Sequence, residues 1–256
     1  METRPEPWIK ALRNSHDRLL ALSGPLDRGQ LEQGSYDSEW TIAQVLSHLG
    51  SQAEIFGLFL NAGLAGQDPP GREEFVPIWD MWNAKDPQAQ AADALAADAA
   101  TLARFESLDA GQRAQLRLRA FGREMDLAGI ARMRLGEHAI HTWDVAVALD
   151  PSATVAPDAV GLLIDTISPL AARTGKPDGT QRRLRVVTSD PERQFVLETG
   201  DAISLKESAG EEGPPELRLP AEALIRLVYG RLDPDHTPVA ADSPSLDEVR
   251  GLFPGF

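Results

Sequence analysis

Two side chains that commonly bind metal ions lie four residues apart in the apolar stretch LGEHAIHTWDVAVAL, residues 135–149. On a helical projection of about 100° per residue, Glu137 falls at the centre of the apolar face and His141 falls near it, about 6 Å further along the axis. A buried carboxylate without a partner is costly, so Glu137 should meet a cation or a metal ion. The stretch therefore predicts a helix with two inward-facing candidate metal ligands.

A third candidate ligand, His48, lies in EWTIAQVLSHLGSQAEIFGLFLNAGL, residues 39–64, on the face that this segment would bury. Two histidines and one carboxylate suit Zn²⁺ or a similar divalent ion, and they leave a coordination position open, as in catalytic sites. His138 is a rival ligand, because it precedes His141 by three residues. It falls at the edge of the apolar stripe, however, so we rank it below Glu137.

The same residues also allow a purely structural interpretation. A single inward histidine is often a core residue that is hydrogen-bonded to a neighbour, so His48 could bond Gln52 or a backbone carbonyl group. Glu137 could in turn pair with Arg134 or Arg132. Residue spacing alone leaves the metal site and this alternative open.

Other polar and aromatic side chains are expected to have structural places. His16 and His236 lie in polar stretches of the sequence, which predicts surface positions, and Trp143 is expected to pack between helices. The chain has no Gly-rich phosphate loop and no Gly-x-Ser-x-Gly elbow. Phosphate binding through such a loop and serine hydrolase chemistry are therefore not indicated.

The first part of the chain has the periodicity of long amphipathic helices. A capping box of Thr41 and Gln44 marks one helix start, and Asp86 followed by proline marks another. The stretch 65–86 is expected to be a long connection, in which Trp79 and Trp82 either line a cavity mouth or pack. The expected helices cover residues 7–22, 39–64, 86–108 and about 127–149.

The second part of the chain has a different pattern of apolar and polar residues. Residues 150–158 are rich in proline and small residues, which predicts a linker. Beyond it we expect three short strands within 183–208 and three helices, over residues 158–173, 219–230 and 245–253.

Two local features of this part carry further predictions. Ser245 and Glu248 form a potential capping box for the last helix, and the basic cluster QRRLRVV, residues 181–187, is expected at a sheet edge. The whole pattern predicts an α+β protein with two domains, a four-helix bundle over residues 1–150 and a small α+β domain over residues 151–256.

Composition excludes several classes of function. The 256 residues are 42% hydrophobic and 25% charged, which is typical of a globular protein, and the net charge of -14 argues against a nucleic-acid partner. Because cysteine is absent, disulfides, thiolate ligands and a cysteine nucleophile are excluded, so any thiol must come from outside. With no signal-peptide pattern and no apolar run of about 20 residues, we expect a cytoplasmic protein without a membrane partner.

EWTIAQVLSHLG, followed some ninety residues later by MRLGEHAIHTWDVAVAL, resembles the mycothiol-dependent maleylpyruvate isomerase family within the wider DinB-like metal-binding superfamily. The matching motifs are Trp-Thr-x-x-x-Val-x-x-His-Leu around His48 and Glu-x-x-x-His-x-x-Asp around Glu137 and His141. This resemblance covers the four-helix half and implies a DinB-like bundle. The second half, with its short strands and LVYGR, resembles less specifically the family's smaller, sterol-carrier-protein-like domain.

The resemblance implies a Zn²⁺ ion held by His48, Glu137 and His141, with its open position meeting the low-molecular-weight thiol mycothiol. Coordination keeps such a thiol in its thiolate form, which adds to an activated double bond or displaces a leaving group. An arginine of the C-terminal domain assists in the isomerase, and Arg231 is the candidate for it here. The alternative is that Arg231 only complements the dipole at a helix end.

The first functional hypothesis is therefore a metal-dependent thiol transferase or isomerase that uses mycothiol on a small electrophile, as a monomer or homodimer. The second is a non-catalytic protein of the same superfamily that binds a metal ion or small molecule. The third is a related fold whose pocket holds no metal. The residues do not identify maleylpyruvate itself as the substrate.

Overall fold

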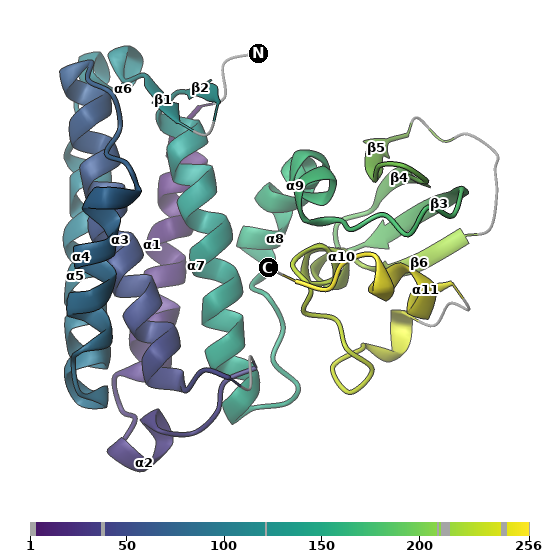
Figure 1. Cartoon of the computed structure of the whole chain (residues 1–256), viewed down its shortest axis with the longest axis horizontal. Helices are drawn as coiled ribbons and strands as arrows, with labels where there is room; N and C mark the ends of the chain where they lie inside the picture. Colours follow the sequence, from purple (N-terminus) through teal and green to yellow (C-terminus); the bar gives the residue numbers. More distant parts are fainter. Residues whose placement is uncertain are drawn as a thin grey trace. The chain divides into compact units, whose positions relative to one another are not determined.

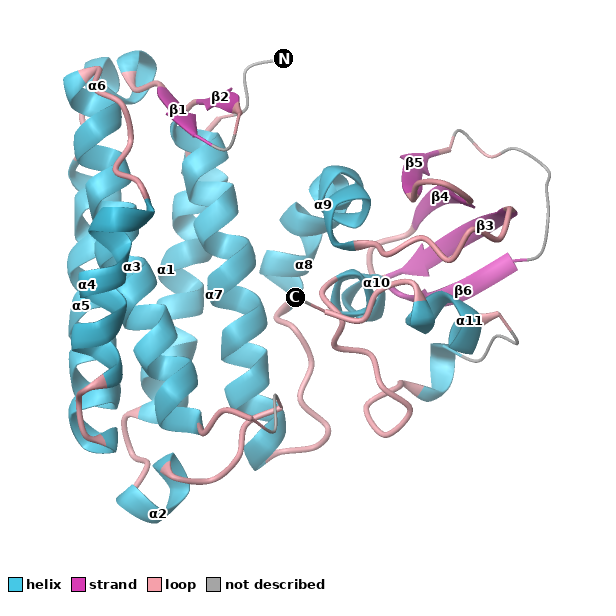
Figure 2. Cartoon of the chain, viewed as in Figure 1, coloured by secondary structure: helices cyan, strands magenta, loops and turns pink. Residues whose placement is uncertain are grey.

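The computed structural model describes residues 4–36, 39–120, 122–208, 210, 216–241 and 245–255. The chain divides into two compact units, Met1–Ala153 and Thr154–Phe256. Long helices make up most of the first unit, and a four-stranded sheet with short helices makes up the second (Figures 1 and 2). This confirms the predicted α+β class.

Four long helices lie side by side in the first unit (Figure 1). α3 packs against α5 and α7, and α1 packs against both α7 and α5. All four predicted helices are confirmed to within a few residues at their ends. Their bounds are α1 Glu6–Ser23, α3 Ile42–Ala65, α5 Pro87–Ser107 and α7 Leu127–Leu149.

Side-chain caps fix where these helices begin. Thr41 and Gln44 form the predicted capping box at the start of α3, with hydrogen bonds of 2.8 and 3.2 Å. Asp86 caps α5 as expected, and Asp126 caps α7 by accepting a bond from the backbone of Gly129 at 2.8 Å. The caps satisfy amide groups that have no partner within the helix. They therefore fix the residue at which α3 and α7 begin, and with it which side chains lie on each face of the helix.

The shorter elements of this unit are α2 Arg28–Leu31, α4 Arg72–Asn83, α6 Ala110–Gln115 and an antiparallel hairpin of β1 Leu118–Ala120 and β2 Arg123–Met125. The prediction of a long connection over 65–86 is wrong, because α4 occupies most of it. Its apolar residues recur at helical spacing, at Phe75, Ile78, Trp79 and Trp82. Glu74 caps its start by accepting a bond from the Gly71 amide at 2.9 Å.

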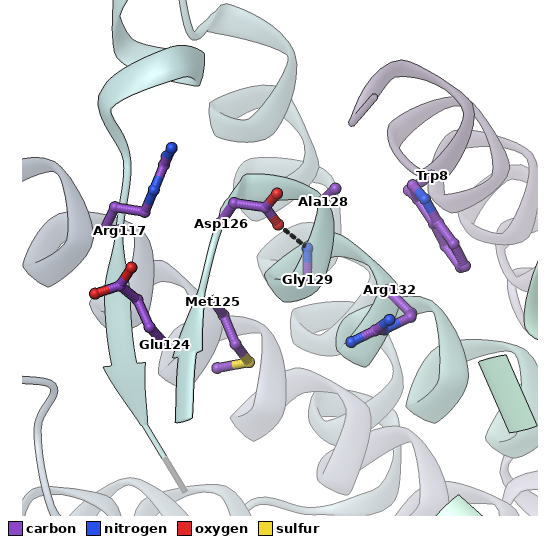
Figure 3. A pocket seen from close by; sticks show the side chains of 8 residues that line it. All are labelled: Trp8, Arg117, Glu124, Met125, Asp126, Ala128, Gly129 and Arg132. Atoms are coloured by element: carbon purple, nitrogen blue, oxygen red, sulfur yellow. Dashed lines mark hydrogen bonds between the residues drawn. The ribbon is translucent and has the colours of Figure 1, made fainter. Parts of the chain in front are cut away.

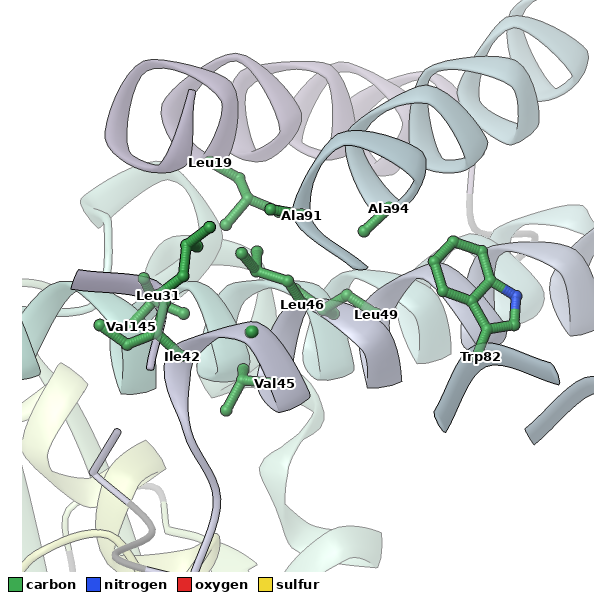
Figure 4. Packing of buried hydrophobic residues seen from close by; sticks show 11 residues of the cluster. Leu19, Leu31, Ile42, Val45, Leu46, Leu49, Trp82, Ala91, Ala94 and Val145 are labelled. Carbon is green, nitrogen blue, oxygen red and sulfur yellow. The ribbon is translucent and has the colours of Figure 1, made fainter. Parts of the chain in front are cut away.

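Trp82 belongs to the hydrophobic core rather than to a cavity mouth. Its side chain is 1% exposed and belongs to a buried cluster of leucine, isoleucine, valine and alanine side chains, in which Leu49 and Ala94 lie nearest to it in Figure 4. A Cβ atom placed on Gly50 would lie 2.3 Å from the Trp82 ring, so the indole needs this glycine. The indole nitrogen donates to Glu54 at 3.0 Å. The packing alternative for Trp82 is therefore confirmed.

The second unit contains a sheet in the order β5-β4-β3-β6, with β6 parallel to β3 and the other pairs antiparallel. α10 packs against β3, β6, α8 and α9. The elements are α8 Pro157–Leu163, η1 Ile164–Thr166, α9 Ile167–Thr174, β3 Arg182–Ser189, β4 Arg193–Thr199, β5 Ser204–Glu207, β6 Glu216–Pro220, α10 Ala221–Val228, η2 Val239–Ala241 and α11 Leu246–Gly251.

Three predictions for this unit need correction. The helix expected over 158–173 is interrupted by a 3₁₀ turn, because Pro169 cannot donate to the carbonyl group four residues earlier. The basic cluster of 181–187 is not at a sheet edge, because β3 lies between β4 and β6. Its charges are accommodated because strand residues alternate: Leu184 is buried, whereas Arg183 points to the exposed side and lies 3.7 Å from Glu198.

The third correction concerns the capping box at the last helix. Ser245 has helical backbone angles, φ -83° and ψ -8°, and makes no side-chain cap. A capping residue needs an extended backbone for its oxygen to reach the first amide groups. Glu248 instead accepts a bond from Arg182 at 3.2 Å. In the described ranges of both units, no helix combines the length and the apolar character needed to cross a membrane.

Candidate metal centre

His48 of α3 and Glu137 and His141 of α7 come together between the two helices. Glu137 Oε2 lies 3.7 Å from His48 Nε2 and 3.8 Å from His141 Nε2, and the two imidazole centroids are 4.6 Å apart. One ligand atom from each residue falls within 4.8 Å of the other two. Within the described part of the chain, this is the one such group of three metal-ligand side chains.

These separations suit a divalent ion. In a tetrahedral site with bonds of about 2.1 Å, ligand atoms lie about 3.4 Å from one another. The two carboxylate–imidazole distances exceed this value by only a few tenths of an ångström. Two neutral imidazoles and a carboxylate are also the donor set expected for Zn²⁺ with one position left open. The residues present therefore fit a metal ion.

The cluster is half-buried rather than deeply buried. The side chains of His48, Glu137 and His141 are 24%, 27% and 13% exposed. The helical projection predicts Glu137 at the centre of the buried face, whereas its exposure places it near the rim of that face. One side of the cluster therefore reaches solvent, which would give a small molecule access to an open coordination position.

Asp144 contacts the His141 ring at Nδ1, the nitrogen that faces away from Glu137. Its Oδ2 lies 2.8 Å from His141 Nδ1, and the residue is 1% exposed. A proton on Nδ1 leaves the lone pair on Nε2, the atom that faces Glu137. Carboxylates placed in this way commonly fix the tautomer and ring orientation of metal-binding histidines. The sequence motif included this aspartate, but residue spacing alone did not reveal its contact.

Gln52 bridges the two helices beside the proposed ligands. Its side-chain nitrogen lies 3.3 Å from His48 Nε2 and donates to Glu137 Oε2 at 3.5 Å. The His48–Gln52 pairing considered as an alternative to metal binding is therefore present. The amide contacts the same two atoms that would bind an ion, so it must move aside or turn when an ion enters. The Trp40 ring, 5.4 Å from the His48 ring, covers another side of this imidazole.

The pKa values of His48 and Glu137 favour the protonation states that bind a metal ion. Burial lowers the pKa of His48 below its ordinary value, which favours the neutral imidazole. Burial alone would raise the pKa of Glu137. The contact with His48 and the positive charges that the two histidines carry when they are protonated outweigh it and lower the value to about 2. At neutral pH the site therefore offers a carboxylate, and protons compete weakly with a cation for it.

His138 points away from the cluster. Its Nδ1 lies 2.8 Å from Ser15 Oγ and its Nε2 lies 2.9 Å from Asp98 Oδ2. These contacts place His138 outside the group of candidate ligands. The stripe-edge position on which its lower ranking rested is wrong, however, because His138 is 0% exposed and Glu137 is 27% exposed. Arg134 pairs with Asp98 at 2.7 Å, so the alternative that paired Arg134 with Glu137 is not what the structure shows.

The surface position expected for His16 is wrong. The residue is 5% exposed, and its Nδ1 lies 2.8 Å from Asp98 Oδ2. Asp17, beside it in the sequence, is exposed on the outer side of α1, whereas His16 shares the inner side with Leu12 and Leu19. His236 is partly exposed and contacts Asp233 at 2.9 Å.

Arg231 and Trp143 are placed by contacts within their own units. Arg231 follows α10 in the C-terminal unit, and its Nη1 donates to the backbone carbonyl of Tyr229 at 2.9 Å. Trp143 is 2% exposed and packs against Tyr36 with ring centroids 4.9 Å apart. The packing role predicted for Trp143 is confirmed.

A separate cavity of about 320 Å³ lies at the start of α7. Figure 3 shows its lining, with Arg117, Glu124 and Asp126 on one side and Trp8 and Arg132 on the other. Asp126 is engaged in capping α7 there. None of the three candidate ligands is among the lining residues, so the chemistry of the metal centre is not located in this cavity.

A known protein family matches the part of the chain that carries these motifs. The family model described as "Mycothiol maleylpyruvate isomerase N-terminal domain" matches residues 12–146, the stretch that carries all three candidate ligands. A search of curated proteins gives no match.

Solved structures also resemble this chain. A crystal structure of the mycothiol-dependent maleylpyruvate isomerase has a TM-score of 0.69 and 14% sequence identity, covering 94% of this chain and 95% of that one. A crystal structure of a histidine-to-alanine mutant of that enzyme gives the same values. At this identity the likeness shows the fold, and it extends over both units.

Proposed function

The chain belongs to the mycothiol maleylpyruvate isomerase N-terminal domain family, and on that premise we propose that it is a metal-dependent enzyme that uses a low-molecular-weight thiol. The proposed metal ligands are His48, Glu137 and His141, and the proposed ion is Zn²⁺. The observation that carries this proposal is the meeting of these three side chains, from two helices, at a site with one side open to solvent.

A bound divalent ion would supply Lewis acidity that keeps a coordinated thiol in its thiolate form at neutral pH. The chain's own residues prepare the site for this. Glu137 brings a negative charge between the two imidazoles, and Asp144 holds the His141 ring so that Nε2 faces the centre. Since the chain contains no cysteine, the sulfur nucleophile must be a cosubstrate, for which we propose mycothiol.

The reaction class that we propose is thiol addition and elimination at a carbon–carbon double bond conjugated to a carbonyl group. The thiolate forms a carbon–sulfur bond, and the electron pair of the double bond moves to the carbonyl oxygen. Rotation about the resulting single bond follows. The electron pair then returns and expels the thiolate, which gives the trans isomer without net consumption of thiol. Maleylpyruvate is the proposed first substrate, and displacement of a leaving group by the same thiolate would be the transferase variant.

Arg231 is the proposed partner for the negative charge that develops on the carbonyl oxygen. We expect Arg231→Gln to lower kcat by about 10²-fold, the cost of removing one donor that stabilises such a charge. The same substitution should leave the Zn²⁺ dissociation constant unchanged, because Arg231 follows α10 and the proposed ligands lie on α3 and α7. Equal kcat values for the variant and the wild type would remove Arg231 from the mechanism.

The metal content of protein purified without added metal or chelator tests the first step of this proposal. We expect close to one equivalent of a divalent ion in the wild type and a large loss in His48→Ala. If both contain under roughly 0.1 equivalents, and Zn²⁺ titration shows no binding to either, the metal site does not exist.

Turnover separates an enzyme from a binding protein. The metal-loaded protein is incubated with mycothiol and either maleylpyruvate or a halogenated electrophile, and products are followed by chromatography. We expect the wild type to consume the substrate only when thiol is present, and we expect His48→Ala not to consume it. Thiol binding without product from any electrophile would favour the alternative of a non-catalytic binding protein.

A further inference from the structure

A second polar cluster lies inside the helical bundle, and the chemistry proposed above does not use it. Asp98 of α5 is 5% exposed and is contacted by three side chains. Its Oδ2 lies 2.8 Å from His16 Nδ1 of α1 and 2.9 Å from His138 Nε2 of α7, while its Oδ1 accepts a bond from Arg134 of α7 at 2.7 Å. Ser15 completes the cluster by contacting His138. One buried carboxylate thus connects α1, α5 and α7.

Arg134 extends this connection to the fourth helix. The nitrogen that donates to Asp98, Nη2, also donates to the backbone carbonyl of Leu49 in α3 at 3.1 Å. Leu49 follows His48 directly, and Arg134 precedes Glu137 by less than one helical turn. The guanidinium group therefore links the backbone beside one proposed ligand to the helix that carries the other two.

The cluster is not a second metal site, although it contains two histidines and a carboxylate. The same Oδ2 atom of Asp98 is contacted by both rings, and the Arg134 cation already occupies the other carboxylate oxygen. A fixed positive charge in this place would repel a metal ion. Among the described residues, the three-residue group of the candidate metal centre is the one with metal-ligand geometry.

Stability alone gives little reason for an arginine at this position. Its side chain is 2% exposed, and Nε and Nη1 are buried without a hydrogen-bond partner in the described part of the chain. The guanidinium lies 5.7 Å over the Phe56 ring, which offers some compensation. Apolar residues of similar size often stabilise a core as well as a buried ion pair does, or better. The directional contacts of Arg134 are what an apolar side chain would not supply.

We propose that Asp98 and Arg134 are positioning residues for the candidate metal centre, because they fix the register of α3 against α7. Apolar packing is non-directional and tolerates small slides of one helix along another. A guanidinium that bonds a carboxylate and a carbonyl at once has a narrow range of geometry. A slide of one residue is about 1.5 Å along the axis, which would spoil the separation of 3.7 Å between His48 and Glu137.

This inference rests on the proposed metal site, and Arg134→Lys tests it. Lysine keeps the positive charge beside Asp98, but its side chain is shorter than that of arginine, so its one nitrogen is not placed as Nη2 is to bond both Asp98 and the Leu49 carbonyl. Thr101→Val is the matched control, because it removes another buried bond between α5 and the α3 backbone, from Thr101 Oγ1 to the Ala53 carbonyl at 2.8 Å. Neither substitution touches a proposed ligand.

Three measurements are made on metal-free protein and on protein titrated with metal. They are the Zn²⁺ dissociation constant by chelator competition, the visible absorption spectrum with Co²⁺ in place of Zn²⁺, and thermal unfolding without metal. For Arg134→Lys we expect affinity at least about tenfold weaker, the usual cost of disturbing groups that orient ligands, and an altered Co²⁺ spectrum. For Thr101→Val we expect a lower Tm with the affinity and spectrum of the wild type.

The outcomes separate this inference from the proposed function. If the wild type binds no metal, the metal site itself fails, and the positioning role fails with it. If the wild type binds Zn²⁺ and folded Arg134→Lys binds it within about twofold with an unchanged Co²⁺ spectrum, only the positioning role is overturned. Should Arg134→Lys not fold, Asp98→Asn, which keeps an acceptor for Arg134, is measured in the same way. Failure of both variants to fold would make the cluster a folding determinant and overturn the inference.

Discussion

Replacing Asp144 tests the candidate metal centre through the contact that this carboxylate makes with the proposed ligand His141. The carboxylate is 1% exposed and lies 2.8 Å from His141 Nδ1, on the side of the ring away from Glu137. Asp144→Asn keeps the shape of the side chain and can keep an acceptor oxygen toward the ring, but it removes the charge. Asp144→Ala removes the contact altogether. Both variants leave the three proposed ligands in place.

The structure allows the size of the effect to be worked out. A hydrogen bond that involves a charged group contributes about 1.5 to 3 kcal/mol, and about 1.4 kcal/mol corresponds to a tenfold change in affinity. Loss of the contact should therefore weaken Zn²⁺ binding by about 10- to 100-fold, the range typical of carboxylates that orient metal-binding histidines. We expect Asp144→Asn near the lower end of that range and Asp144→Ala near the upper end.

Competition with a chromophoric chelator at pH 7 measures the Zn²⁺ affinity of each variant, and circular dichroism checks that each one folds. Asp150→Asn is the control, because it makes the same chemical change at the C-cap of α7, where the side chain accepts two bonds from the exposed Ser152. It should bind Zn²⁺ like the wild type. An Asp144→Asn affinity within about twofold of the wild type would refute the reasoning. An equal loss in Asp150→Asn would show an effect of net charge rather than of ring orientation.

Three further predictions follow from the same contacts. Glu137→Gln should weaken Zn²⁺ binding more than His138→Ala does, because His138 contacts no proposed ligand. A competition titration in which His138→Ala loses more affinity than Glu137→Gln would contradict this. Gly50→Ala should lower the free energy of unfolding in urea by about 1–3 kcal/mol, because its Cβ meets Trp82 at 2.3 Å. Burial lowers the pKa of His48 and His138, so the folded state binds fewer protons than the unfolded chain below the ordinary histidine pKa. The free energy of unfolding of metal-free protein should therefore fall between pH 7 and pH 5, by up to about 1.4 kcal/mol per pH unit for each histidine, and a flat profile in denaturant titrations would count against these shifts.

Local sequence signals predicted the parts of the fold that local interactions decide. The Thr41–Gln44 capping box and the Asp86 cap are short-range hydrogen bonds, and both appear where the sequence placed them. Apolar periodicity was equally reliable where it was counted. α4 was not predicted, although Phe75 and Trp82 have the spacing of one helical face.

Strand order depended on pairing across a longer distance. The cluster 181–187 reads as a charged edge when only the antiparallel partners that follow it are considered. β6, Glu216–Pro220, pairs with β3 in parallel from the other side and makes β3 an interior strand. The sequence around β3 does not indicate that β6 pairs with it, because a parallel neighbour can come from any distance along the chain.

The buried positions of Asp98 and His16 show where sequence reasoning meets its physical limit. Each is polar, and each is buried with partners that are far away in the sequence. His16 contacts Asp98, which is 82 residues away, and Asp98 also contacts Arg134 and His138. A prediction from local polarity places a residue in a polar stretch at the surface, and it cannot show that polar residues of one helix pair with those of another. The surface prediction for His16 failed for this reason.

The half-burial of Glu137 follows from the same property of helix bundles. α7 packs against α1 and against α3, so its buried arc is wider than its apolar stripe. Arg134 and His138, at 1% and 0% exposure, lie deeper in that arc than Glu137 because they find partners on the other helices. The polar junction fills the deep part, and the proposed ligands are left at the rim, where solvent reaches them. A candidate metal site that reaches solvent and a closed polar cluster on one helix are thus two consequences of the same packing.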